Sequence, residues 1–270
     1  AIDPSYAPAH ALVVRNHMLL GGWGNRIESI ALAHTALERA MLVDSMNSDI
    51  WVAAGTVYWE LDWDWQEGEA ALKKAISLDP ANYVAHWEYS GLLYYSGRYH
   101  EAEREAATAV ELNPLYAQPI RQLGMISLAL ERYENAITHC KRAATLSRYN
   151  QDGALLCQFR AHEALGQEEQ AGEVLRQLAD LGGPIGGLAM HRLGTIDESL
   201  FQRWADEASG FWAALIFADR GEYDRAIEEL IEAKSSSPAA LISIRRFRYY
   251  PALWSDPRMH AIVREVGLEP

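Results

Sequence analysis

The sequence predicts an all-α fold of stacked helix pairs, because one sequence unit recurs every 34 residues (65, 99, 133). The aromatic residues Trp65, Tyr99 and Tyr133 begin the three clearest copies. In the first copy, small residues follow at Gly68 and Ala75, and the other two copies have alanine at the same places. Apolar residues recur at helical spacing around these markers. A lone helix pair cannot cover its own apolar face, so the repeat predicts a stack of pairs.

This pattern, with a closing proline at Pro80 and again at Pro114, resembles the tetratricopeptide repeat. The resemblance implies an all-α, right-handed superhelical α-solenoid of about six helix-turn-helix units with a C-terminal capping helix. The array is expected to occupy residues 1–181. Its units are expected at about 7–44, 49–82, 83–116, 117–150 and 151–181.

The first unit is expected to be longer than the standard one. Residues 7–20 and 27–43 are apolar at helical spacing, and a glycine-rich stretch at 21–24 separates them. The second unit, from Asp49, has one extra residue in its turn. Residues 1–4 match the end of a repeat, so we expect the chain to begin partway through a longer array.

After residue 181, glycines at 182, 183, 186 and 187 predict a break in the array. The break is expected to span 182–206 with irregular helices, the second of them capped by Asp197. Residues 207–270 are expected to hold a final unit, with Gly221 in its turn, and a cap continuous with the array. The capping helix should cover the last pair with one apolar side, formed by Met259, Ile262, Val263 and Val266.

Two side-chain roles follow from the repeat. Small residues such as Ala109 and Ala143 are expected to let neighbouring helices approach closely. The turn aromatics, Tyr99 among them, are expected to fill the wedge within each pair. If Tyr99 is buried in this way, Tyr99→Ala should cost about 3–5 kcal/mol.

The composition limits the classes of function. The chain has 270 residues and a net charge of −13, and an acidic surface opposes binding of nucleic acid. Its apolar runs are too short to cross a bilayer. Cys140 and Cys157 lie in helical patterns, which favours free thiols in a reducing compartment and a cytoplasmic location.

Catalytic and metal sites find little support in the motifs. His10 and His17 share a helix face, and His162 follows Cys157, but no spacing typical of a zinc site occurs. Asp62 lies in a repeat turn, where aspartate is favoured for hydrogen bonding. The glycine clusters lack the strand-then-helix context of nucleotide-binding loops. We therefore expect no catalytic residues, no metal ligands and no cofactor.

The concave groove is the more informative region. In superhelical arrays the first helix of each pair, here called the A helix, lines the groove. Lysine and asparagine, which clamp the acidic tails of chaperones in related families, are absent from the matching positions. An apolar peptide fits the aromatic groove better, although the same rings could simply pack between helices. The predicted groove residues are Thr56, Trp59, Trp87, Glu88, Gly91, Tyr94, Tyr95, Arg121, Gln122 and Met125.

A wider resemblance covers nearly the whole chain. The expanded first repeat, the segment YWELDWDWQEGEAALKKAISLDPANYVAHWEYSGLL, the glycine-rich break and the ending SDPRMHAIVREVGLEP resemble the C-terminal tetratricopeptide regions of bacterial multidomain signalling and transcriptional regulators. In those proteins the array follows a winged-helix or class III cyclase domain, so the resemblance implies an output domain before Ala1.

The leading functional hypothesis is a non-catalytic protein–protein interaction and regulatory module. It would bind a partner protein or peptide, or a second copy of itself, in the concave groove and thereby control the output domain. Two alternatives remain open. One is a small-molecule sensor with an apolar aromatic pocket, and the other is a scaffold or self-association module.

Overall fold

The protein was analysed as a computed structural model, which describes residues 7–20, 26–147, 151–197, 199, 201, 210–236 and 238–269. Helices and turns account for these residues, and no strand occurs among them. The chain forms two compact units. Unit 1 combines Ala1–Gly97 with Leu230–Pro270, and unit 2 is Arg98–Glu229. The predicted all-α fold class is confirmed, while the predicted unit boundaries stay predictions.

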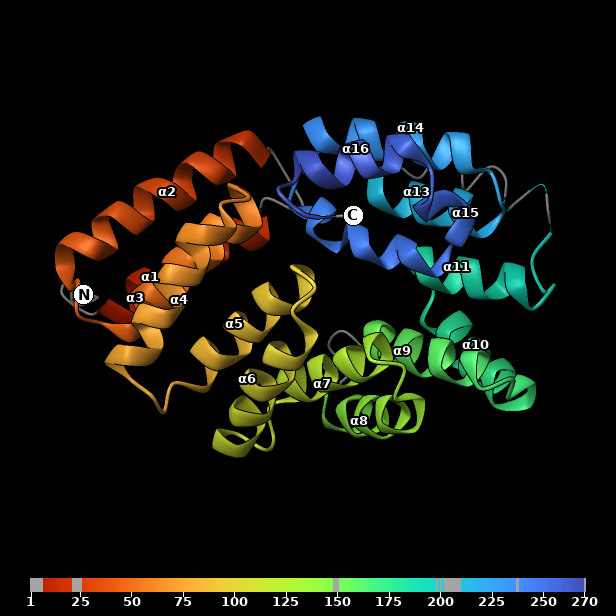
Figure 1. The fold of residues 1–270 in the computed structure, drawn as a ribbon, viewed down its shortest axis with the longest axis horizontal. Coiled ribbons are helices and arrows are strands. Elements are labelled where there is room, and N and C mark those ends of the chain that lie inside the picture. The colour runs from red at the N-terminus through yellow and green to blue at the C-terminus, as the bar shows by residue number, and fades with distance from the viewer. Residues whose placement is uncertain are drawn as a thin grey trace. The chain divides into compact units, whose positions relative to one another are not determined.

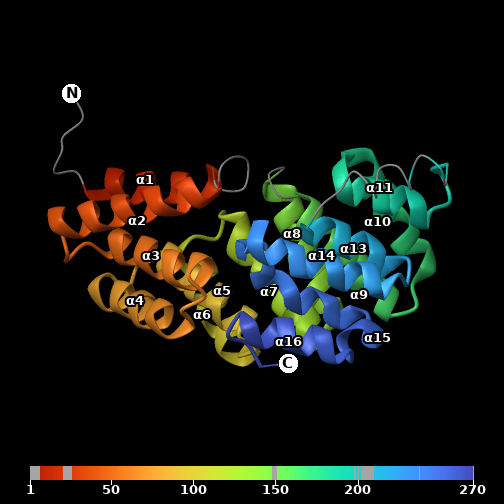
Figure 2. The same cartoon turned by 90° about the horizontal axis from the view of Figure 1, so that it is seen from above.

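Unit 1 begins with helix pairs stacked in successive layers, which Figure 2 shows from above. Helix α1 packs on α2, and α3 packs on α4 (Figure 1). Their shared core contains the fully buried Val14, Ala33 and Ile50. The helices are α1 (Ala7–Leu20), α2 (Arg26–Val43), α3 (Ser48–Thr56) with its π-helical continuation η1 (Val57–Leu61), α4 (Trp65–Leu78) and α5 (Tyr83–Tyr95).

The extra residue predicted in the second unit is absorbed by η1. The helix pair α3–α4 has Asn47 as N-cap and a left-handed turn residue at Trp63, sixteen positions on (63 − 47). The next pair has Asn82 and Gly97, which are fifteen apart (97 − 82). A π-turn accommodates one added residue, and the Asp62 N–H donates to Val57 O five residues back at 3.3 Å.

The turn inside each pair uses one backbone conformation at the repeat interval. Trp63, Gly97 and Glu131 are 34 residues apart and have φ of 56°, 89° and 60°. Gly221, which was predicted to lie in the turn of the final unit, also has positive φ, as does Gly166. Side chains disfavour this region, so the turns at Trp63 and Glu131 carry strain that the glycine turns avoid.

The C-terminal segment belongs to unit 1, which the sequence pattern did not predict. The indole N–H of Trp65 donates to Val266 O at 2.7 Å, and Arg245 Nε donates to Tyr95 O at 2.8 Å. These bonds fasten the end of the chain to the turns of the second and third helix pairs. The segment comprises the 3₁₀ helix η2 (Pro238–Tyr249), α15 (Pro251–Trp254) and α16 (Pro257–Glu265).

The expected capping helix is present as α16. Its apolar side is buried at all four expected positions, namely Met259, Ile262, Val263 and Val266. An ion pair of 2.7 Å between Lys234 Nζ and Glu265 Oε2 places it beside the end of α14 (Tyr223–Ser236), as Figures 1 and 2 show.

Unit 2 is also built from stacked helix pairs. Helix α7 packs on α8, and α9 packs on both α8 and α10. Leu155, Phe159 and Leu178 lie in the core of its later part. The helices are α6 (Tyr99–Leu112), α7 (Ala117–Ala129), α8 (Tyr133–Leu146), α9 (Gln151–Ala164), α10 (Glu168–Leu181), α11 (Gly183–Arg192), α13 (Gly210–Asp219) and the start of α14.

The predicted break at the glycine-rich stretch is wrong for residues 183–187, which are helical. Only Gly182, with φ of 69°, separates α10 from α11. A Cβ atom on Gly186 would lie 3.0 Å from Leu178 O, so glycine allows α11 to pack closely on α10. Asp197 accepts the Ser199 N–H at 3.0 Å, as a cap would. Most of the helix expected after Asp197 lies outside the described residues, as does the stretch 21–24.

A buried ion pair joins α11 to its neighbours. Arg192 Nε donates to Asp219 Oδ1 at 2.9 Å, and Arg192 Nη1 donates to Glu163 at 2.8 Å. The guanidinium also lies 5.0 Å from the centre of the Phe159 ring. These contacts connect α9, α11 and α13.

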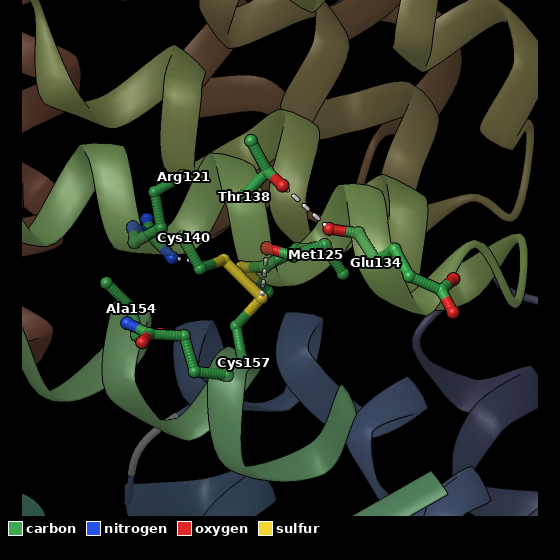
Figure 3. Close-up of a disulfide and its surroundings, with 9 residues drawn as sticks. Arg121, Met125, Glu134, Thr138, Cys140, Ala154 and Cys157 are labelled. Carbon is green, nitrogen blue, oxygen red and sulfur yellow. Dashed lines mark hydrogen bonds between the residues drawn. A yellow bond between two sulfur atoms is a disulfide. The ribbon is translucent and has the colours of Figure 1, made fainter. Parts of the chain in front are cut away.

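The two cysteines form a disulfide, so the expectation of free thiols is wrong. Cys140 on α8 is bonded to Cys157 on α9 (Figure 3). Both residues are buried, as expected for Cys140. Gly124 on α7 faces this bridge, and a Cβ atom there would lie 3.3 Å from Ala136 O. The disulfide therefore fixes α8 to α9 where α7 also packs closely on α8.

The packing roles were predicted in part. Ala109 is fully buried and Ala143 nearly so, as close helix contacts require. The turn aromatics Trp65, Tyr99 and Tyr133 are only partly buried. We therefore expect a smaller cost for Tyr99→Ala than for a fully buried ring, because a partly exposed ring loses fewer contacts on truncation.

Candidate binding site

A cavity opens between the A helices of the first three helix pairs, all within unit 1. Its volume is about 440 Å³. Helix α1 forms one wall, and the first turns of α3 and α5 form the other. The lining residues are Ala11, Leu12, Arg15, Asp49, Val52, Asp79, Ala81, Asn82, Tyr83 and Val84.

Asn82 fixes the wall of the cavity that α3 and α5 share. Its carbonyl oxygen accepts the N–H groups of Val84 at 3.1 Å and Ala85 at 3.2 Å, which caps α5. Its amide donates to Ser48 Oγ and to Asp49 Oδ1, each at 2.9 Å. One side chain thus starts α5 and ties it to α3.

The predicted groove residues of α3 and α5 continue the helix faces that line the cavity. Residues three or four apart share a helix face, so Val52 leads to Thr56, and Val84 leads to Glu88 and then Gly91. Thr56 is buried, and its hydroxyl donates to Val52 O at 2.9 Å. A Cβ atom on Gly91 would lie 3.7 Å from the Trp59 ring, so this glycine leaves room for the indole.

Two carboxyl groups lie next to each other beyond the cavity. Glu88 is 7% exposed, and its Oε1 lies 3.9 Å from Arg15 Nη2. Burial raises the pKa of Glu88. Burial also raises the pKa of Glu60, on η1, and the nearby charge of Glu88 raises it further; Arg15 opposes both shifts. The single guanidinium does not balance the pair, which retains a proton more readily than exposed glutamates do.

The predicted aromatic residues divide into interior and partly exposed rings. Trp59 is 2% exposed and stacks on Tyr95, with ring centres 5.7 Å apart. Tyr94 is also buried and meets Tyr95 edge to face. Trp87 and Tyr95 are partly exposed. Trp59 and Tyr94 therefore pack between helices, which was the alternative explanation for the aromatic residues. Trp87 and Tyr95 are rings that a partner could reach.

The other three predicted groove residues lie on α7, in unit 2. Gln122 is 4% exposed and Met125 is 8% exposed. Arg121 is partly exposed, and its Nη1 lies 3.0 Å from Met125 Sδ. Figure 3 shows Arg121 and Met125 beside the disulfide. Arg121 also lies against α9, because a Cβ atom on Gly153 would be 3.4 Å from its Nη1.

Sequence reasoning missed the charged residues of the cavity. The groove residues were chosen by counting 34-residue intervals along the units from Asp49 onward. Arg15 lies on α1, before that point, and was therefore not chosen. The added residue in η1 shifts the helix face, which is why Glu60 was not selected. The N-cap role of Asn82 was readable from its place before an apolar helix.

Other kinds of site are not supported in the described part of the chain. It contains no group of three or more histidine, cysteine, aspartate or glutamate side chains that could hold a metal ion. The side chains of His10 and His17 lie outside the described residues. No described helix has both the length and the apolar character needed to span a membrane.

Comparisons with known proteins support the fold. Residues 122–150 match the family model described as Tetratricopeptide repeat. The structure of Pseudomonas aeruginosa pilF superposes with a TM-score of 0.54 at 20% identity, over 89% of this chain and 99% of that one. The structure of PilW, described as a type IV pilus biogenesis factor, gives 0.52 at 15% identity, over 93% and 98%.

No curated protein sequence is significantly similar to the chain. At these identities the two structural matches show the fold alone. The chain is therefore an all-α helix-repeat protein that contains a tetratricopeptide repeat at residues 122–150.

Proposed function

We propose that this chain is a non-catalytic interaction module that binds a segment of a partner protein along the A helices of unit 1. The cavity of about 440 Å³ carries the proposal, because three successive A helices build it. Its size suits one or two side chains of a bound segment. The apolar residues Leu12, Val52 and Val84 line it, and the partly exposed Trp87 lies one turn beyond Tyr83 on α5.

The contacts at the cavity support a preformed site. Asn82 bonds to both α3 and α5, so these walls are held in place before any partner arrives. A preformed wall lowers the entropy cost of binding. The proposal includes the regulatory role implied by the wider resemblance, in which partner binding would control an attached output domain.

Cys140 and Cys157 are bonded to each other, so free thiols no longer support the predicted cytoplasmic location. Disulfides persist in oxidising compartments and are rare in the cytosol. The Cys140–Cys157 bridge therefore favours maturation in an oxidising compartment over the cytoplasmic location. Mass spectrometry of the alkylated protein, isolated from its native cells without reductant, would decide between them through the presence or absence of two modified thiols.

A random 12-residue peptide library displayed on phage tests the proposed function. Ala81 lines the cavity and is exposed, so Ala81→Trp should fill the cavity without disturbing the core. We expect enrichment of peptides on the wild-type chain and at least tenfold weaker binding of those peptides to Ala81→Trp. Glu111→Trp, an exposed position in unit 2, is the matched control and should bind normally. No enrichment, or equal loss in both variants, would contradict the proposal.

A further inference from the structure

We propose that the partner segment presents a basic side chain beside an apolar one, so that the cavity of unit 1 selects lysine- or arginine-containing peptides. This inference rests on the proposed function, and it names the chemistry of the partner. The observation behind it is the unequal charge around the cavity.

Two carboxylates line the cavity itself. Asp49 Oδ1 accepts the Asn82 amide at 2.9 Å, and Asp79 Oδ1 accepts the Ala81 N–H at 3.0 Å. Both donors are neutral, so they orient the carboxylates without cancelling their charge. Apolar side chains line the cavity beside them, such as Leu12 on α1 and Val84 on α5. A bound cation would thus meet two fixed negative charges next to an apolar wall.

The basic residue of the cavity is directed elsewhere. Arg15 lines the cavity, but its guanidinium faces Glu88 at 3.9 Å. Glu60 shares that guanidinium, and burial raises the pKa of both glutamates. The charges that line the cavity are therefore two aspartates against one arginine, and that arginine faces Glu88.

The charge of the whole chain acts in the same direction. The net charge of −13 raises the rate at which a basic partner reaches the surface, and it repels acidic partners. An acidic peptide would have to approach the carboxylates of Asp49 and Asp79 with only Arg15 of the lining residues to bind. Charge complementarity therefore favours a basic segment over an acidic or neutral one.

The peptides enriched from the phage library test the inference. We expect lysine or arginine next to leucine, isoleucine, valine or phenylalanine in most of them. The double variant Asp49→Asn with Asp79→Asn keeps both hydrogen-bond acceptors and removes both charges. Fluorescence polarisation of a labelled selected peptide should show about tenfold weaker binding to it. Glu111→Gln with Asp180→Asn, which removes two exposed charges from unit 2, should change the affinity less than twofold.

The direction in which Arg15→Gln changes the affinity separates a basic partner from an acidic one. Arg15→Gln removes the only cation lining the cavity, so a basic peptide should bind about threefold more tightly. Weaker binding to Arg15→Gln would overturn the inference, because it would identify the arginine as the group that holds the partner.

The two proposals fail in different ways. If the enriched peptides lose binding in Ala81→Trp but are acidic or uncharged, the proposed function stands and this inference falls. If no peptide depends on the cavity, both fall.

Discussion

The second and fourth helix pairs follow the same 34-residue pattern, yet they are held together in different ways. In unit 1, α3, η1 and α5 meet through stacked rings around Trp59 and through an acid pair. In unit 2, α8 is fixed to α9 by a disulfide. The first arrangement depends on packing and on pH, and the second is covalent. A shared repeat thus sets the fold, while inserted or substituted residues decide what stabilises each junction.

The largest expected effect tests whether the stacked rings around Trp59 stabilise unit 1. Trp59 is buried against Trp65, Tyr95 and Gly91, so Trp59→Ala should lower the free energy of unfolding by about 3–5 kcal/mol. Hydrogen exchange should show faster exchange in α3, α4 and α5. Trp212→Ala, at a tryptophan that is 36% exposed, is the matched control and should cost far less. Equal costs would mean that the Trp59 cluster is not a core.

Reduction of the disulfide tests the covalent half. The bridge links residues 17 apart in sequence, and closing a loop of this size stabilises a fold by about 3 kcal/mol. Dithiothreitol should therefore shift the urea midpoint downward by a corresponding amount. The variant Cys140→Ala with Cys157→Ala should show no response to the reductant. If complete reduction left the urea midpoint of the wild type unchanged, the disulfide would not stabilise unit 2, and the contrast between the two junctions would disappear.

The acid pair should make unit 1 respond to pH. A carboxyl whose folded pKa is raised binds more protons in the folded state than in the unfolded one. Its stabilising contribution is thus greatest below the ordinary glutamate value of about 4.3 and is lost as pH rises toward the folded pKa. Urea midpoints should fall between pH 5 and pH 8.

Glu88→Gln isolates this effect. Glutamine resembles the protonated carboxyl, so the variant should gain about 1 kcal/mol at pH 8 relative to pH 5. Glu111→Gln, an exposed glutamate in unit 2, should leave the pH profile unchanged. Parallel profiles for both variants would show that the pair at Glu60 and Glu88 is not the source.

The smallest effect concerns the turns. Glu131 is exposed and has φ of 60° at the place where the preceding pair has Gly97. Glu131→Gly should therefore raise the free energy of unfolding by about 0.5–1 kcal/mol, and Gly97→Ala should lower it by about 1 kcal/mol. Opposite signs in matched urea titrations would confirm that one backbone conformation repeats along the array.

Much of the fold was accessible from the sequence because its determinants are local. The interval between Trp65, Tyr99 and Tyr133 predicted where helices start, and the extra residue before Trp65 anticipated η1. The glycine-rich stretch misled, because Gly186 serves close helix packing while the same residue type elsewhere ends helices. Cys140 and Cys157 were judged by their places in helical patterns, and spacing does not reveal that α8 and α9 bring them together.

The candidate site was harder to predict, because it depends on contacts between pairs. Thr56, Glu88 and Gly91 lie on the A helices of unit 1, and whether they contact a partner stays a prediction. Arg15 and Glu60 join them only through the packing of α1 and the shift in η1. Trp59 illustrates why the exposed face of a helix is hard to predict. Its position in the helix follows from the repeat, but the rings that bury it come from neighbouring helices.

The hydrogen bond from Trp65 to Val266 spans 201 positions of the chain. During synthesis at about 5–20 residues per second, the partner of Trp65 emerges roughly 10–40 seconds after it. Unit 2 is complete before the last segment of unit 1 exists. The helix pairs around Trp65 are therefore synthesised before the segment that covers their edge. We expect a chaperone on the nascent chain to act at this uncovered edge.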